Sequence, residues 1–121
     1  KVTLSAAQIK TCSSVPIEIV AAPGAGFAVH PLSVAYRFNW NSVAFDNAAG
    51  YLQTDTTSAL IMPTFNNLSQ SYSSFTRGDV DVQGEDDIVE NKALNFTANA
   101  DSTATGDSTV DVFLTYNIIT L

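Results

Sequence analysis

The stretch that decides the fold reads Val34-Ala35-Tyr36-Arg37-Phe38-Asn39-Trp40. Large apolar residues occupy every second position, and the residues between them are small or polar. Successive side chains of a β-strand point to opposite faces, so this alternation predicts a strand with one buried face. The aromatic side chains fit a pleated, half-buried surface.

The C-terminal residues repeat this alternation. The apolar row there consists of Val110, Val112, Leu114, Tyr116 and Ile118. We expect this row to face the core and the alternate residues, among them Phe113, to face the other way.

Weaker strand patterns cover residues 16–22, 27–32, 43–45, 51–54 and 93–98, and Pro31 marks an edge or a bulge. Residues 101–107 are expected to form a hairpin loop into the last strand, and residues 63–71 a further helical turn. Ser5 and Gln8 have the spacing of a capping box, which predicts a helix of about two turns that ends before Ser13. Seven or eight short strands predict an all-β fold, an antiparallel jelly-roll-like β-sandwich with one short N-terminal helix, as a single domain over residues 1–121.

The composition limits the choice of partners. Of the 121 residues, 45% are apolar and only 14% are charged, and the net charge is −7. An acidic domain repels phosphate backbones, so we expect no nucleic acid partner. No apolar run approaches the ~20 residues that span a bilayer, so we expect no membrane association. The lone Cys12 allows no intrachain disulfide and no cysteine-based zinc site.

No catalytic, cofactor-binding or metal-binding residue is assigned, and we do not expect an enzyme. His30, the only histidine, precedes Pro31 in an apolar run with no nucleophile elbow nearby, so we interpret it as incidental. Cys12 is interpreted as a small buried residue. Gly24 and Gly26 lack the rest of a phosphate-loop fingerprint and predict a turn between strands.

The acidic segment at residues 79–90 matches part of a calcium loop. Asp79, Asp81 and Glu90 fall at ligand positions of an EF-hand pattern, but Gln83 stands where Asp or Asn is usual and the flanking residues look extended. We favour an acidic surface loop and leave calcium binding open. Within the same region, Arg77-Gly78-Asp79 spells a tripeptide that adhesion receptors read on exposed loops, a match that arises easily by chance.

Both ends of the chain resemble a group of small structural proteins of tailed bacteriophages. Residues 2–9 and 15–26, VTLSAAQI and VPIEIVAAPGAG, are similar to N-termini of that group, which run L-T-x-A-Q-I and then P-V-x-L-V-x-A-P-G-A-G-K. Residues 90–94, the Gly106-Asp107 turn and residues 110–116 resemble its closing strands. Phe27 departs from the lysine common in the group, and residues 41–83 find no match.

The resemblance implies a virion structural protein, a capsid decoration (cement) or head-fibre subunit assembled in the bacterial cytoplasm. Its expected partners are the major capsid protein or other virion proteins, and a dimer or trimer is expected. Arg37, or Phe113 with Ile119, could supply the contact surface, although Phe113 could equally lie under a second sheet. The alternative is a receptor- or glycan-binding fibre module, in which Trp40, Tyr51 and Tyr72 would stack on sugars.

Overall fold

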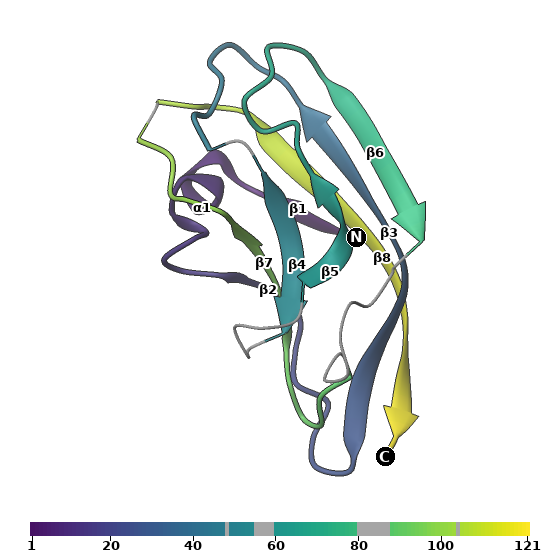
Figure 1. Ribbon diagram of the computed structural model, residues 1–121. Helices are drawn as coiled ribbons and strands as arrows, with labels where there is room; N and C mark the ends of the chain where they lie inside the picture. The colour runs from purple at the N-terminus through teal and green to yellow at the C-terminus, as the bar shows by residue number, and fades with distance from the viewer. Residues whose placement is uncertain (48, 55–59, 80–87, 104) are drawn as a thin grey trace.

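Two antiparallel four-stranded sheets pack face to face in the computed structural model, which describes residues 1–47, 49–54, 60–79, 88–103 and 105–121 (Figure 1). Within these residues the elements are β1 (Val2–Leu4), α1 (Ala6–Thr11), β2 (Ile17–Val20), β3 (Phe27–Asn39), β4 (Gly50–Thr54), β5 (Leu60–Phe65), β6 (Ser74–Asp79), β7 (Leu94–Ala98) and β8 (Thr109–Thr120). The predicted all-β sandwich with one short N-terminal helix is confirmed.

The strand order is that of a jelly roll. One sheet runs β1-β8-β3-β6 and the other β2-β7-β4-β5. In each sheet the outer pairs join strands whose numbers sum to nine: β1 with β8, β3 with β6, β2 with β7, and β4 with β5. This is the pattern of one long antiparallel hairpin that has been rolled up, so that β8 also pairs with β3 and β7 with β4.

The two sheets meet in an aromatic core. Tyr36 and Phe38 point inward from β3, as the alternation predicts, and both are completely buried. The Tyr36 ring centroid lies 5.3 Å from that of Phe65 on β5 and 6.1 Å from that of Phe96 on β7. Burial of each large side chain contributes about 1.5–3 kcal/mol to stability.

Two close approaches of backbone to ring make the core intolerant of added volume. A Cβ atom on Gly106 would lie 2.2 Å from Cδ1 of Phe45, and one on Gly50 would lie 2.3 Å from Cζ of Phe96. Both distances are shorter than any ordinary van der Waals contact, so glycine is the only residue that fits at these positions without a shift of the ring.

The predicted inward row on β8 is correct only in its first half. Val110 and Val112 are buried and Leu114 packs against the core, but Tyr116 is 42% exposed and Ile118 48%. The cause lies in strand length. β3 and β8 have 13 and 12 residues, whereas the described strands of the other sheet have four to six. The longer ribbon therefore extends past the strands of the other sheet (Figure 1), and the end of β8 is exposed there although Val29 of β3, opposite Ile118, is buried.

Several boundaries differ from the prediction. The strands predicted at residues 27–32 and 34–40 are a single strand, β3, which ends at Asn39, and the register shift between Pro31 and Ser33 is the bulge that Pro31 predicted. Residues 43–45 form no strand, and residues 63–65 end β5 instead of starting a helical turn. Residues 101–107 form no hairpin, because β7 and β8 belong to different sheets. The predicted strands did not include β1 or β5, and of β6 only the extended character of residues 73–76 was predicted.

The short helix begins as its capping box predicts. The Ser5 hydroxyl accepts a hydrogen bond from the Gln8 amide (3.4 Å), and the Gln8 side chain accepts one from the Ser5 amide (2.9 Å). Ile9 is the buried residue that fixes α1 to the core. Among the described residues, no helix has the length and apolar character needed to cross a bilayer.

Three aspartates join the loops at the end of the sandwich that carries α1. Asp101 accepts hydrogen bonds from the amides of Ser13 (2.9 Å) and Ser14 (3.0 Å) and from the Ser14 hydroxyl. Asp107 accepts from the amides of Ser42 and Val43 and from side chains of the same loop. The third carboxylate, Asp46, accepts bonds from Ser102 and Thr103. The β7–β8 loop is thereby held to both its neighbours.

Candidate interaction face

The outward face of the sheet β1-β8-β3-β6 gathers residues from distant parts of the sequence. Arg37 on β3 lies directly opposite Phe75 on β6, and Ala35 lies opposite Arg77. On its other side, Ala35 pairs with Phe113 of β8. Residues directly opposite in an antiparallel pair point to the same side, so these five side chains share one face.

The two phenylalanines on this face are exposed. Phe75 is 59% exposed and Phe113 37%. Both arginines are exposed as well, and Lys1 Nζ lies 5.6 Å from the Phe113 ring centroid, within cation–π range. We call this surface the Arg–Phe face; it consists of Lys1, Ala35, Arg37, Phe75, Arg77 and Phe113. Phe113 therefore does not lie under a second sheet, and it shares the face with Arg37, so the two surfaces predicted as alternatives are one.

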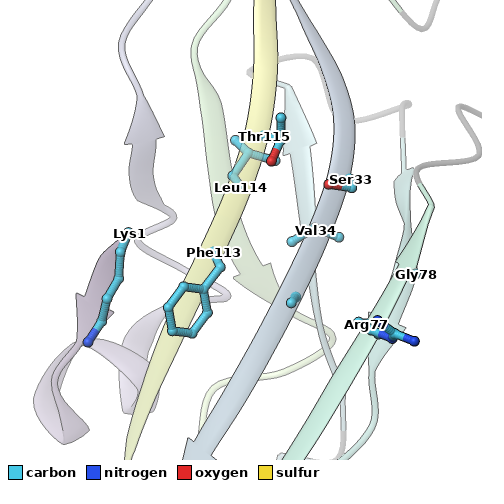
Figure 2. A pocket seen from close by; sticks show the side chains of 9 residues that line it. Lys1, Ser33, Val34, Arg77, Gly78, Phe113, Leu114 and Thr115 are labelled. Atoms are coloured by element: carbon cyan, nitrogen blue, oxygen red, sulfur yellow. The ribbon is translucent and has the colours of Figure 1, made fainter.

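The Arg–Phe face is hollowed in two places that meet at Phe113. The larger hollow, of about 810 Å³, lies between Phe113 and Arg77, and small side chains, among them Ser33 and Ala35, line it. Figure 2 shows Phe113 on β8 and Arg77 on β6 standing on either side of β3. The smaller hollow, of about 470 Å³, is lined by Arg37, Phe75 and Phe113 among others. A partner protein would therefore contact both hollows and the exposed phenylalanine rings of this face.

Asp111 anchors one edge of the face. It is buried and accepts hydrogen bonds from the Thr3 hydroxyl (2.6 Å) and the Asn39 side-chain amide (3.3 Å), and its carboxylate lies 3.1 Å from Lys1 Nζ. The Thr3 bond, followed by Lys1 and Asn39, lowers the pKa of Asp111 despite its burial. Lys1 is thereby placed beside Phe113.

The Arg–Phe face is the basic region of an acidic chain. The chain has five basic residues, and three of them, including both of its arginines, lie on this face. Neither arginine makes an ion pair with any residue that the structure describes, where the one salt bridge is that of Lys1 with Asp111. The other two cations lie elsewhere, Lys10 on α1 and Lys92 in the loop before β7.

The adhesion-type tripeptide lies within a strand. Arg77, Gly78 and Asp79 are the last residues of β6 and pair with Ala35, Val34 and Ser33 of β3. A strand paired along its length does not present the projecting loop that the motif requires. Arg77 therefore belongs to the Arg–Phe face.

The acidic segment is only partly described. Asp79 ends β6, Asp81 lies outside the described residues, and the Glu90 carboxylate accepts a hydrogen bond from the Gly26 amide at 2.6 Å. Next to it, the Asn91 side chain accepts one from the Gly24 amide at 2.9 Å. Glu90 thus holds the turn between β2 and β3. Among the described residues, no group of three His, Cys, Asp or Glu side chains is placed to hold a metal ion.

The structure locates Cys12 and His30, the two side chains considered for catalysis, and the glycine turn. Cys12 is completely buried, its Sγ contacts the Ile9 carbonyl oxygen at 3.1 Å, and burial raises the pKa of the thiol to about 12. His30 lies on β3 opposite Asn117 and is half-buried. Gly24 and Gly26, with φ of 103° and 80°, form the predicted turn between strands.

The aromatic residues considered for sugar stacking do not form one platform. Trp40 follows β3 and packs partly against the core, whereas Tyr51 lies on β4 of the other sheet. Tyr72 is 57% exposed in the loop before β6.

No protein-family model matches the chain, and comparisons with curated proteins and with solved structures find no significant similarity. The chain's own surface is therefore what bears on its function.

The sequence pattern identified part of that surface. It pointed to Arg37 on the amide-rich face of residues 34–40, and to Phe113 as an apolar residue opposite the main apolar row of the last strand. It missed Lys1, Phe75 and Arg77 as members of the same face. Lys1 precedes β1, and Phe75 and Arg77 lie on β6. Both are short edge strands without a long alternation, and only the register across the sheet places them beside β8 and β3.

Proposed function

We propose that this chain is a structural protein of a tailed-bacteriophage particle, a capsid decoration (cement) subunit that binds the head surface and stabilises it. The Arg–Phe face is the observation that carries the proposal. It offers exposed aromatic rings and both arginines on one side of a rigid sheet, the residue types that are enriched at protein interfaces.

The architecture supports a role in assembly. A jelly roll closes its core between two sheets, which leaves the outer face of each sheet available for contact. Viral capsid domains are among the proteins built on this fold, and the likeness of both chain ends to small virion proteins points the same way. A fold hosts many functions, so the weight of the proposal lies on the face.

The proposal is tested on phage particles that lack this protein. Purified protein should co-sediment with such particles, saturate at many copies per head, and raise the temperature at which the heads release their DNA. A few copies per particle would indicate a tail component, and an absence of binding and of stabilisation would overturn the proposal.

A further inference from the structure

We infer that the Arg–Phe face binds an acidic patch on a partner protein, with carboxylates of the partner paired to Arg37 and Arg77 and an apolar group seated against Phe113. This inference deepens the proposed function, on which it rests for the identity of the partner as a virion protein.

The two arginines are spaced to act together. Arg77 lies two residues after Phe75, the residue directly opposite Arg37, so the arginines are diagonal neighbours across β3 and β6. Diagonal neighbours in an antiparallel pair lie ~7–8 Å apart at their Cα atoms. Each guanidinium offers a planar fork that fits a carboxylate in two hydrogen bonds. Two adjacent acidic side chains of a partner therefore match the pair.

Charge complementarity selects the kind of partner. The chain carries a net charge of −7, yet this face holds three of its five cations, and Asp111, the acidic side chain described beside them, is already bonded to Thr3 and Lys1. Two copies meeting through the same face would bring arginine to arginine, which like-charge repulsion disfavours. The complementary surface is an acidic one on a different protein.

A protein surface fits better than a polyphosphate. Nucleic acid binding draws its affinity from many cations along an extended track, whereas here the cations are few and the chain as a whole repels polyanions. The exposed rings of Phe75 and Phe113 also need an apolar counterpart to be covered. Aromatic and arginine residues at the centre of a patch are the usual anchors of a protein interface.

The hollow beside Phe113 defines where the partner inserts a side chain. The hollow has a volume of about 810 Å³ and lies between the Phe113 ring and Arg77. Its floor is lined by small side chains, such as those of Ala35, Ser33 and Thr115. A larger residue at position 35 would fill the hollow from below. Ala35→Phe is therefore a variant that blocks the site without any change of charge.

The test compares two charge reversals of equal size. Arg37→Glu/Arg77→Glu alters the face, and Lys10→Glu/Lys92→Glu alters cations that lie away from it. Each pair takes the net charge of the chain from −7 to −11, because each exchange removes one positive charge and adds one negative charge. Binding to decoration-free particles is measured by co-sedimentation at about 50 and 300 mM NaCl, which span a large change in screening. Circular dichroism checks that every variant is folded.

Arg37→Glu/Arg77→Glu should weaken binding by at least tenfold at low salt, because reversing a charge that contacts the partner is costly. Lys10→Glu/Lys92→Glu should weaken it by less than about threefold, because charges far from the interface act only through long-range interactions that salt screens. Wild-type binding should weaken as salt rises. Ala35→Phe should also reduce binding. If the glutamate variant does not fold, Arg37→Gln/Arg77→Gln replaces it, with a smaller loss expected.

The outcomes separate this inference from the proposed function. If wild-type protein binds particles and the arginine and lysine pairs behave alike, the inference fails while the proposed function stands. If wild-type protein does not bind particles, immobilised poly-L-glutamate serves as the probe, and arginine-dependent retention supports the acidic ligand without the phage assignment. Stronger retention on an oligonucleotide column, or self-association that the arginine pair abolishes, would overturn the inference in favour of nucleic acid or a second copy.

Discussion

The carboxylate of Asp107 accepts the backbone amide of Ser42 at 3.0 Å, across 65 positions of sequence. It also accepts the amide of Val43 at 2.9 Å, so one ionised side chain fixes the start of the β3–β4 loop. The bonds of Ser42, first from its hydroxyl and then from its amide, hold the pKa of Asp107 far below its ordinary value of 3.8. We therefore expect the closure of this end of the sandwich to depend on pH.

Acid should destabilise the protein through Asp107 and Asp101. Because the pKa of each is lowered in the folded state, each stabilises the fold above its ordinary value of 3.8, and the contribution is lost as pH falls below it towards the folded value. We expect the melting temperature to fall as pH decreases from about 6 to about 2. Asp107→Asn should melt lower than wild type at the upper pH and change less on acidification.

Glu18→Gln is the matched control, since it removes one carboxylate from an exposed position of β2. Its melting curve should follow wild type over the whole pH range. Equal pH dependence in wild type and Asp107→Asn would contradict the role assigned to this carboxylate.

Gly106→Ala should destabilise the fold by about 1–3 kcal/mol, the usual cost of overpacking a core. The new methyl group would lie 2.2 Å from the Phe45 ring, which must then move. Urea unfolding measures the change. A Phe45→Leu background should reduce the cost of Gly106→Ala, because the smaller side chain leaves room.

Gly24→Ala provides the contrast. No atom lies within 4 Å of a Cβ built there, but φ is 103°, so the cost comes from backbone strain alone. Phe45→Leu should leave that cost unchanged. A cost of Gly106→Ala that is the same in both backgrounds would show that the Phe45 contact is not its origin.

The Cys12 thiol should resist Ellman's reagent in the native protein and react at once in guanidinium chloride. Its burial and its pKa of about 12 leave almost no thiolate at neutral pH. In a Cys12→Ala background, Ser69→Cys places a thiol at an exposed position and should be labelled without denaturant. Rapid native labelling of Cys12 would mean that α1 opens readily.

Tyr36→Phe should be neutral or stabilising by up to about 1 kcal/mol, although it alters a completely buried core residue. The Tyr36 hydroxyl makes no hydrogen bond of good geometry within the described part of the chain. Burial raises the pKa of the phenol, and the nearby Leu52 backbone reduces that rise only in part. Removing the hydroxyl removes an unsatisfied buried group. A decrease of more than about 1.5 kcal/mol in the free energy of unfolding, measured in urea, would instead show that the hydroxyl makes a stabilising hydrogen bond.

The all-β fold could be predicted from the alternation of apolar and polar residues, but which apolar residues are buried could be predicted only in part. Tyr36 and Phe38 are buried as predicted, because the opposite sheet covers the inner face of β3 at its middle. Tyr116 and Ile118 continue the same alternation yet are exposed, because burial depends on the length of the opposite sheet, which no local pattern encodes.

The candidate site was harder to predict than the fold. Its residues come from three strands that lie far apart in sequence and from Lys1 before β1, and the register between those strands decides which of them become neighbours. Arg77 illustrates the difficulty. Its local sequence was notable only as part of an Arg-Gly-Asp tripeptide, whereas its pairing with Ala35 makes it the diagonal neighbour of Arg37.

The nested pairing of the strands also has a kinetic consequence. Among the strands that the structure describes, β1 hydrogen-bonds only to β8, and β3 pairs with β8 on one side and β6 on the other. During synthesis the first strands therefore have no partners until nearly the whole domain has left the ribosome, and such non-local pairing makes folding slow. The early strands must stay soluble while they have no partner, and the acidic, hydroxyl-rich composition of the chain favours this.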